Sequence, residues 1–278
     1  MKEKKKILII KLIPIIVMFA FFIYYIIYYS IGRLGNELYM VDVFTIFRWV
    51  VKDTYSSFIS IAGPSIIMFL SIYEINIKFR SLDIKTALNR EDYNSYIKKI
   101  FKSAYKYSLV LPIMFLIVFI ICSFLYRDFN FEYYIAVKEN LATFPVKFLR
   151  MPIRFGIVYI LNLFLMSSVY ISLALLCVKK NKNLITSILE STLAYFCILF
   201  VWVFIIEHFI NKYFNIILSN YIDFFDLVSY SSRESLFTSI LSILLLAVIA
   251  FYCVIKSYKN KEKTIMCLER SADGYEED

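Results

Sequence analysis

The amino-terminal part of the chain contains one long apolar run, ILIIKLIPIIVMFAFFIYYIIYY over residues 7–29. Its length suits a helix that crosses a membrane, because about 20 residues at a rise of about 1.5 Å each cover a hydrocarbon core of about 30 Å. Comparable runs follow along the rest of the chain. The predicted spans are residues 7–29, 57–75, 109–126, 155–178, 184–206 and 236–255, six in all.

The composition of the chain indicates that a bilayer surrounds it. Hydrophobic residues make up 60% of the sequence and the mean hydropathy is +0.69, so too little polar surface is present to cover a water-soluble globule. Within a bilayer every backbone polar group needs an internal partner. With only five Gly and five Pro and no alternating polar strands, we expect an all-α polytopic integral membrane protein with a single domain over residues 1–278.

Basic residues predict the orientation of the spans. Cytoplasmic loops of membrane proteins carry an excess of Lys and Arg. Most of the 31 basic residues here fall on one side of the predicted topology, so we expect both termini in the cytoplasm. The chain is rich in Ile, Lys, Asn and Tyr, a composition typical of a bacterial genome. We therefore expect the protein in the bacterial cell membrane. The basic segments on the cytoplasmic side are residues 2–11, 78–106, 179–182 and 256–270.

We expect the net charge of +9 to attract membrane lipids. The basic residues lie beside the predicted spans, where anionic headgroups are found, and are not arranged as in a globular nucleic-acid-binding module. We therefore expect no nucleic acid partner. The run at residues 7–29 exceeds the 7–15-residue core typical of a signal peptide and is not followed by a small-residue cleavage site, so we expect it to remain as the first helix.

Residues for nucleotide, metal or nucleophilic chemistry are sparse. The five glycines are scattered, and no phosphate-binding loop ending in Lys-Ser or Lys-Thr is present. The five cysteines form no C-x-x-C pair, and a single histidine excludes most zinc sites. We expect no cofactor, no metal and no enzymatic activity, so that ATP hydrolysis must come from a separate chain. His208 beside Glu207 leaves an intramembrane enzyme as a remote alternative.

Three polar residues within the predicted spans are candidates for a transport pathway. Glu190 lies inside the predicted fifth span, where a lone carboxylate is costly and needs a partner or water. It could contact substrate or relay protons in a cavity, but we favour a helix-packing role. Asn162 and Ser168, in the predicted fourth span, are the other candidates.

The largest cytoplasmic segment covers residues 77–107. Ser81 or Asp83 can begin a short helix, and Asn89 can cap a second, longer one. In that second helix apolar residues recur at spacings of three and four, so we expect one face to lie against the membrane or a partner. On the outer side, residues 211–233 are too polar for a further span and predict an interfacial or re-entrant segment. The apolar face would contain Tyr93, Tyr96, Ile97, Ile100, Phe101 and Ala104, and the lysines directed at headgroups would be Lys98, Lys99, Lys102 and Lys106.

The stretch ALNREDY over residues 87–93 is similar to a small-Leu-x-Arg-x-x-Tyr pattern of the permease subunits of type-2 ABC exporters. The layout of six helices, cytoplasmic termini and a segment between the second and third spans also resembles that family. The resemblance implies a coupling helix over residues 81–88 that docks on a separate ABC ATPase, and a permease homodimer or heterodimer. The implied docking residues are Arg80, Asp83, Lys85 and Leu88.

The same resemblance implies export of an amphipathic peptide, a lipid or a drug-like molecule, and antimicrobial peptides are frequent substrates of such bacterial permeases. A different class of function fits the same topology. The chain could be a membrane scaffold or immunity protein that transports nothing and whose basic loops recruit a partner. A neighbouring gene for an ATPase would favour the exporter, and a neighbouring toxin gene would favour immunity.

Overall fold

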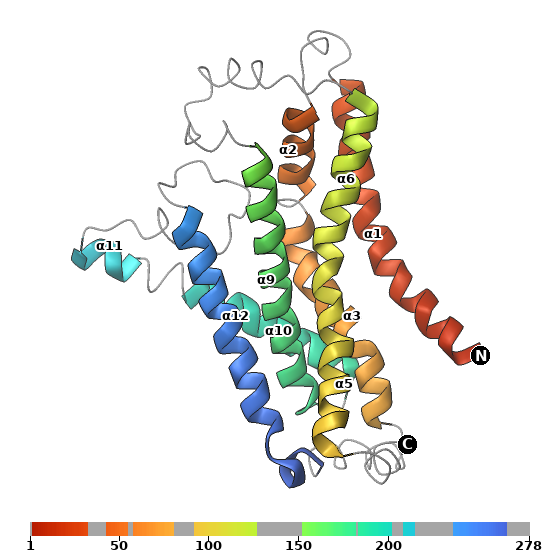
Figure 1. Ribbon diagram of the computed structural model, residues 1–278, viewed down its shortest axis with the longest axis vertical. Coiled ribbons are helices and arrows are strands. Elements are labelled where there is room, and N and C mark those ends of the chain that lie inside the picture. Colours follow the sequence, from red (N-terminus) through yellow and green to blue (C-terminus); the bar gives the residue numbers. More distant parts are fainter. Residues whose placement is uncertain are drawn as a thin grey trace.

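The computed structural model describes residues 2–32, 43–54, 58–80, 92–126, 152–181, 183–201, 208–214 and 236–265. Over these residues the regular elements are helices and no strand occurs, which confirms the all-α prediction. Figure 1 shows most of them side by side along the long axis. The helices are α1 (Lys2–Gly32), α2 (Val43–Thr54), α3 (Ser60–Arg80), α5 (Tyr93–Tyr105), the 3-10 helix η3 (Lys106–Leu109), α6 (Val110–Tyr126), α9 (Pro152–Val178), α10 (Leu184–Phe200), α11 (His208–Phe214) and α12 (Leu236–Tyr258).

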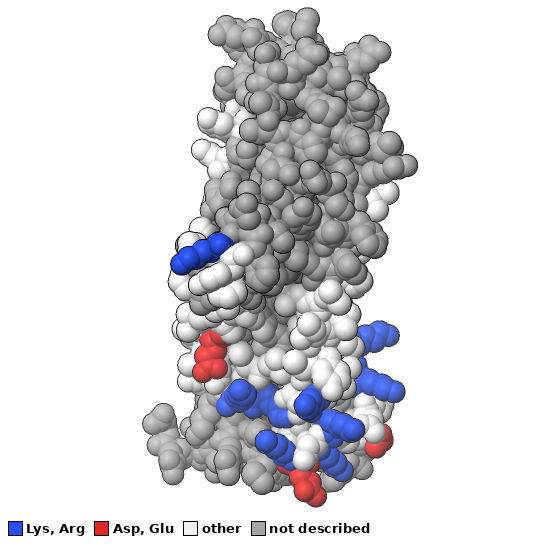
Figure 2. Space-filling model, turned by 90° about the vertical axis from the view of Figure 1, so that its left-hand side faces the viewer, with Lys and Arg blue, Asp and Glu red and all other residues white. Residues whose placement is uncertain are grey.

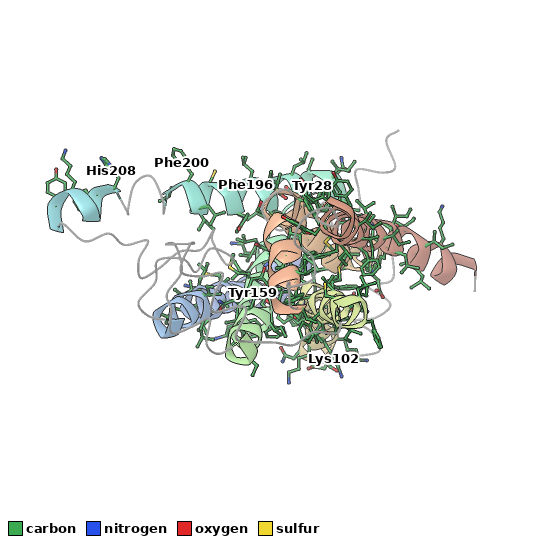
Figure 3. The ribbon with its side chains drawn as sticks, turned by 90° about the horizontal axis from the view of Figure 1, so that it is seen from above. Tyr28, Lys102, Tyr159, Phe196, Phe200 and His208 are labelled. Atoms are coloured by element: carbon green, nitrogen blue, oxygen red, sulfur yellow. The ribbon has the colours of Figure 1, made fainter. Side chains whose placement is uncertain are left out.

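Helix α9 is the centre of the bundle. It packs against α3, α6, α10 and α12. Its buried side chains include Tyr159 and Leu175, and the Tyr159 ring stacks on Phe115 of α6 with 4.5 Å between the ring centroids. Seen from above, Tyr159 lies among the helices (Figure 3). Burial of this helix on several sides explains why its sequence is apolar around nearly its whole circumference.

Helix α1 has the opposite environment. Many of its large apolar side chains, such as Leu8, Ile13 and Ile16, are exposed. Its inner face packs on α2 and α3. A helix that exposes so many Ile and Leu side chains needs an apolar solvent, so α1 agrees with the first predicted span at residues 7–29.

Helices α5, η3 and α6 follow one another without a break and form one long rod (Figure 1). The tighter η3 turn lies just before Pro112, which has no N–H to bond to the carbonyl of Ser108, so the α-helical ladder is interrupted at this place. The N-cap of α5 is Asp92, and Asn89 lies outside the described residues. The predicted apolar face exists, since Tyr93, Ile97, Ile100 and Ala104 are buried, but they are buried within the bundle of this chain and not against the membrane or a partner. This face packs on α3 and α9, and the helix stands along the bundle axis.

Helix α10 runs across the bundle, as Figures 1 and 3 both show. It packs on α9 and α3 through residues spaced by four. Its buried face carries small or polar side chains, while Ile185, Leu189 and Leu193 on the other face are exposed. This distribution is the reverse of a water-soluble helix and fits a lipid environment. The buried residues are Ser187, Ser191, Tyr195 and Leu199.

Within the described residues, three helices are long and apolar enough to cross a membrane: Lys6–Tyr29, Tyr93–Leu125 and Tyr159–Val178. They overlap the first, third and fourth predicted spans and support a membrane protein. Helices over Leu184–Phe200 and Ile243–Tyr258 are apolar but shorter. Six spans, the location of the termini and the single-domain organisation stay predictions.

Candidate functional site

Among the residues that the structure describes, most exposed lysines lie at one end of the bundle. Figure 2 shows several Lys side chains on the lower end of the described surface, with fewer acidic ones among them. This end contains the start of α5, the end of α12 and the turn between α9 and α10. The exposed lysines there include Lys98, Lys99, Lys102, Lys106, Lys180, Lys256, Lys259, Lys261 and Lys263.

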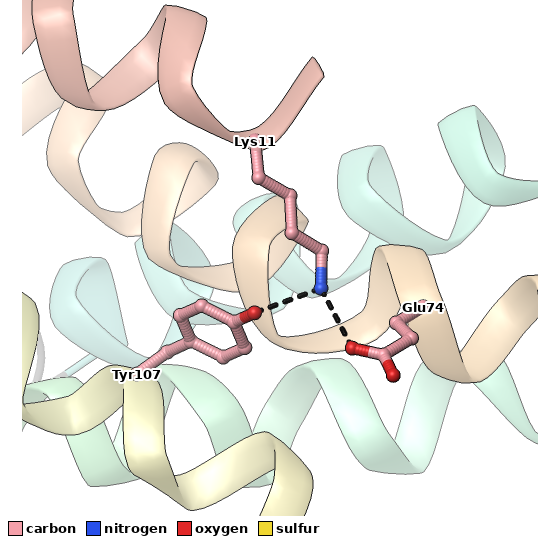
Figure 4. A network of polar contacts seen from close by, with 3 residues as sticks. All are labelled: Lys11, Glu74 and Tyr107. Atoms are coloured by element: carbon pink, nitrogen blue, oxygen red, sulfur yellow. Dashed lines mark hydrogen bonds and ion pairs between the residues drawn. The ribbon is translucent and has the colours of Figure 1, made fainter. Parts of the chain in front are cut away.

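Two further lysines at this end are buried. Lys11 on α1 has its Nζ atom 3.1 Å from a carboxylate oxygen of Glu74 on α3 and 2.8 Å from the hydroxyl oxygen of Tyr107 on η3 (Figure 4). The side chains of Lys11 and Glu74 are 7% and 27% exposed. The Lys11 ammonium also lies 4.8 Å from the centroid of the Tyr107 ring. Three helices that are distant in sequence therefore meet at one charged contact, which we call the Lys11 cluster.

The Lys11 cluster was missed in the sequence. Lys11 belongs to the basic segment at residues 2–11, and Glu74 lies at the end of a predicted span. Neither position by itself predicts that the two residues form an ion pair. The signal that could have found it is one basic residue within an otherwise apolar run and one acidic residue in another run. Charges inside membrane helices usually pair with each other because the isolated charge is costly there.

The second buried lysine, Lys179, lies where α9 ends. Its Nζ donates to the carbonyl oxygen of Ser257 on α12 and lies 5.1 Å from the centroid of the Tyr258 ring. Tyr258 is buried and donates to the carbonyl oxygen of Leu175 at 2.8 Å. The hydroxyl of Tyr93, at the start of α5, donates to the carbonyl oxygen of Tyr258 at 2.6 Å. These contacts, the Tyr258 cluster, join the ends of α9 and α12 to the beginning of α5.

Higher in the bundle the contacts between helices are made by hydroxyl groups. The Oγ of Ser65 on α3 lies 3.1 Å from Oγ1 of Thr192 on α10. The hydroxyl groups of Tyr105 and Ser172 are 2.7 Å apart and connect α5 with α9. Such hydrogen bonds hold membrane helices together at about 0.6 kcal/mol each on average.

The predicted pathway residues do not form one site. Asn162 is fully buried in α9. Ser168 lies on the same helix and donates to the carbonyl oxygen of Phe164 at 2.9 Å. Glu190 is exposed and accepts a hydrogen bond from Asn181 at 2.7 Å. Since Asn162 is about 24 Å of helix rise from the end of α9, it lies far from the Asn181–Glu190 pair.

The exposure of Glu190 has a simple geometric reason. Glu190 lies on the outer face of α10 with Leu189 and Leu193, whereas its neighbour Ser191 lies on the buried face. Asn181 in the preceding turn then reaches its carboxylate. Glu190 is thus exposed and hydrogen-bonded to a residue of the preceding turn, and its role in packing or transport stays a prediction.

The predicted coupling residues fall at the edge of the described chain. Arg80 is the last residue of α3, and its side chain lies outside the described part. Asp83, Lys85 and Leu88 lie outside the described residues altogether. What the structure does place are the two helices on either side of this segment, α3 and α5, which pack against each other.

His208 is described by the structure, whereas its neighbour Glu207 lies outside the described residues. His208 is exposed at the start of α11, beyond the end of α10 and away from the core (Figure 3). Among the described residues no group of three His, Cys, Asp or Glu side chains could hold a metal ion.

Comparisons of the chain with protein-family models, with curated proteins and with solved structures give no match.

Proposed function

We propose that the chain is the membrane permease subunit of an ATP-driven exporter whose ATPase is a separate protein. The observation that carries this function is the connection between the Lys11 cluster and the two helices that flank residues 81–91. Glu74 lies on the helix that leads into this segment, and Tyr107 lies on the rod that leads out of it. Both side chains are hydrogen-bonded to Lys11 of α1. A movement of the segment would therefore be transmitted to α1, α3 and the rod together.

The path for such a push is short. Glu74 precedes the end of α3 by about 9 Å of helix rise. At the other end of the segment, Tyr93 in the first turn of α5 bonds to the end of α12. Helices α3 and α5 also pack on each other and on α9. A segment held between firmly packed helices is well placed to transmit movement, because packed interfaces shift between discrete arrangements instead of deforming continuously.

In this function, residues 81–88 dock on the ATPase through Arg80, Asp83, Lys85 and Leu88. Closure of the ATPase on ATP pushes the segment and alternates access to a pathway between α3, α9 and α10. The buried Asn162 and the nearby Ser168 would line its deeper part, and Glu190 with Asn181 would lie at the mouth on the basic end. The hydroxyl contacts between α3 and α10 would break and re-form as access changes.

The proposed topology has six spans in one domain with both termini in the cytoplasm of a bacterial cell. The excess of Lys and Arg in residues 2–11, 78–106, 179–182 and 256–270 supports this orientation. Two permeases, identical or different, would form the pathway together, as the resemblance implies. An amphipathic peptide, a lipid or a drug-like molecule is the proposed cargo.

The test is gentle affinity purification of the tagged chain from its native membrane, followed by mass spectrometry and an ATP hydrolysis assay. The exporter function requires an ATPase at near-stoichiometric amounts. An intact chain that repeatedly purifies without one would favour the scaffold or immunity function and would contradict the permease.

A further inference from the structure

The exposed side chains along the rod formed by α5, η3 and α6 change from basic to apolar at one position. Lysines occupy the exposed face on α5 and η3, and large apolar side chains occupy it from Leu109 onward. All these residues recur at spacings of three or four, so they lie on one side of the rod. In order along the chain they are Lys98, Lys102, Lys106, Leu109, Ile113, Leu116, Ile120 and Phe124.

The change at Leu109 places the edge of the hydrocarbon core. From Leu109 to the end of α6 at Tyr126 the rod rises by about 26 Å, which is close to the thickness of the core, about 30 Å. The α5 helix must then project out of the hydrocarbon. The headgroup layer adds about 5–7 Å on each side of the core. Because η3 rises about 2 Å per residue, Lys106 lies about 6 Å beyond Leu109, Lys102 about 12 Å and Lys98 about 18 Å.

Helix α12 contributes a lysine at the same level. The ring of Phe251 lies 5.5 Å from that of Tyr105, and the ring of Tyr258 lies 5.4 Å from that of Phe101, measured between centroids. Lys256 falls between these two contacts and is therefore level with the Lys102 turn of α5. It also follows directly on the exposed apolar residue Ile255, so α12 leaves the hydrocarbon at about the same depth.

These three lysines are open to a partner in the described part of the chain. Lys102, Lys106 and Lys256 are exposed, and none forms an ion pair within the described part of the chain. Figure 3 shows Lys102 at the outer edge of the bundle, opposite Phe196 and Phe200. The Lys106 ammonium lies 5.0 Å from the centroid of the Tyr107 ring, which keeps it beside the end of the apolar face. Long lysine stems can lie along apolar surface while the charge reaches the headgroups.

We propose that Lys102, Lys106 and Lys256 form a binding surface for the phosphate groups of anionic phospholipids in the leaflet that surrounds them. Each lysine near such a surface contributes attraction that falls off within a Debye length. Lys106 lies within the headgroup layer, and the long stems of Lys102 and Lys256 let their ammonium groups reach back into it, whereas the equally exposed Lys98 stands one turn farther out, beyond that reach. The surface requires only that the rod crosses the membrane, and it does not depend on the function proposed above.

The test is a lipid titration of the purified full chain in detergent, followed by native mass spectrometry. The probes are phosphatidylglycerol, which is anionic, and phosphatidylcholine, which has no net charge. We expect Lys102→Gln/Lys106→Gln/Lys256→Gln to weaken phosphatidylglycerol binding at least about tenfold, with phosphatidylcholine binding unchanged. The arginine variant Lys102→Arg/Lys106→Arg/Lys256→Arg should bind as the unaltered protein does, which also shows that the positions tolerate substitution.

The matched control removes three lysines of the same end that lie farther from the hydrocarbon. Lys98→Gln/Lys261→Gln/Lys263→Gln has the same net charge as the first variant and should bind phosphatidylglycerol within about twofold of the unaltered protein. Equal loss in both variants would show that only total charge matters and would overturn the proposal. Unchanged lipid binding in the first variant, together with loss of a co-purifying protein, would assign the lysines to that protein and would overturn it as well.

Discussion

The ammonium group of Lys11 lies 3.1 Å from a carboxylate oxygen of Glu74, although 63 residues separate them in the chain. The contact is nearly buried and is shared with the hydroxyl group of Tyr107. It fixes α1 and α3 to the rod that starts with α5, at the basic end of the bundle. The segment that would meet an ATPase lies between two of these helices, so this contact relates the stability of the fold to its proposed movement.

Removing one charge of the pair should destabilise the protein more than removing both. Lys11→Met leaves the Glu74 carboxylate without this cation in a poorly hydrated place, at a cost of about 3–5 kcal/mol. The double variant Lys11→Met/Glu74→Gln removes the isolated charge and should recover most of that loss. Thermal unfolding in detergent measures both effects. Equal destabilisation in the single and double variants would show that the two charges do not interact.

The Tyr258 cluster gives a second test of the basic end. Tyr93→Phe removes the hydroxyl that donates to the carbonyl oxygen of Tyr258 and should lower the free energy of unfolding by about 1 kcal/mol. Tyr252→Phe is the matched control, because Tyr252 is 62% exposed on the same α12 helix. That change should leave the melting temperature nearly unaltered. A melting temperature lowered equally by both changes would contradict the burial of the Tyr93 contact.

The packing of α10 across the bundle can be tested with paired cysteines. The hydroxyl groups of Ser65 and Thr192 are 3.1 Å apart, so Ser65→Cys/Thr192→Cys should form a disulfide under mild oxidation in a chain whose native cysteines have been replaced. Ser65→Cys/Leu193→Cys is the control, because Leu193 is 64% exposed and lies on the outer face of α10. Gel mobility after oxidation measures the extent of cross-linking in both variants. Equal cross-linking of the two pairs would contradict the position of α10.

Charge reversal in the coupling segment should separate ATP hydrolysis from assembly. In vesicles that contain the purified complex, Asp83→Lys or Lys85→Asp should leave the ATPase bound while lowering hydrolysis severalfold, because contacts through these residues would pass the movement on. Lys259→Asp reverses a charge at the same end of the bundle but outside the segment and should have little effect. Full hydrolysis in both segment variants would contradict the assignment of these residues.

Local patterns in the sequence predicted local structure well. The apolar run at residues 7–29 became most of α1, and the spacing of Tyr93, Ile97, Ile100 and Ala104 predicted the buried face of α5 correctly. Both depend on neighbours within one helix, where the period of the side chains determines which face is apolar. The change from lysine to leucine along the same rod likewise follows from the order of the residues.

Relations between helices were not predictable in this way. An apolar run of the same kind forms α10, but its hydropathy contains no information on whether the helix follows the bundle axis or crosses it. The partners of Lys11 and Glu74 depend on how α1 and α3 meet. The hydrogen bond between Asn181 and Glu190 likewise depends on how the turn after α9 folds back on α10, and the role of Glu190 stays a prediction. These features require the packing of whole helices.

Photo-crosslinking from position 85 in native membranes tests the central claim most directly. A photoreactive amino acid placed there lies within the segment expected to touch the ATPase, and the same group at position 259 is the control outside it. We expect a cross-link to an ATP-binding protein from position 85, identified by mass spectrometry, and a much weaker one from position 259. Cross-links from position 85 only to lipid, or to a protein that binds no ATP, would contradict a permease driven by a separate ATPase.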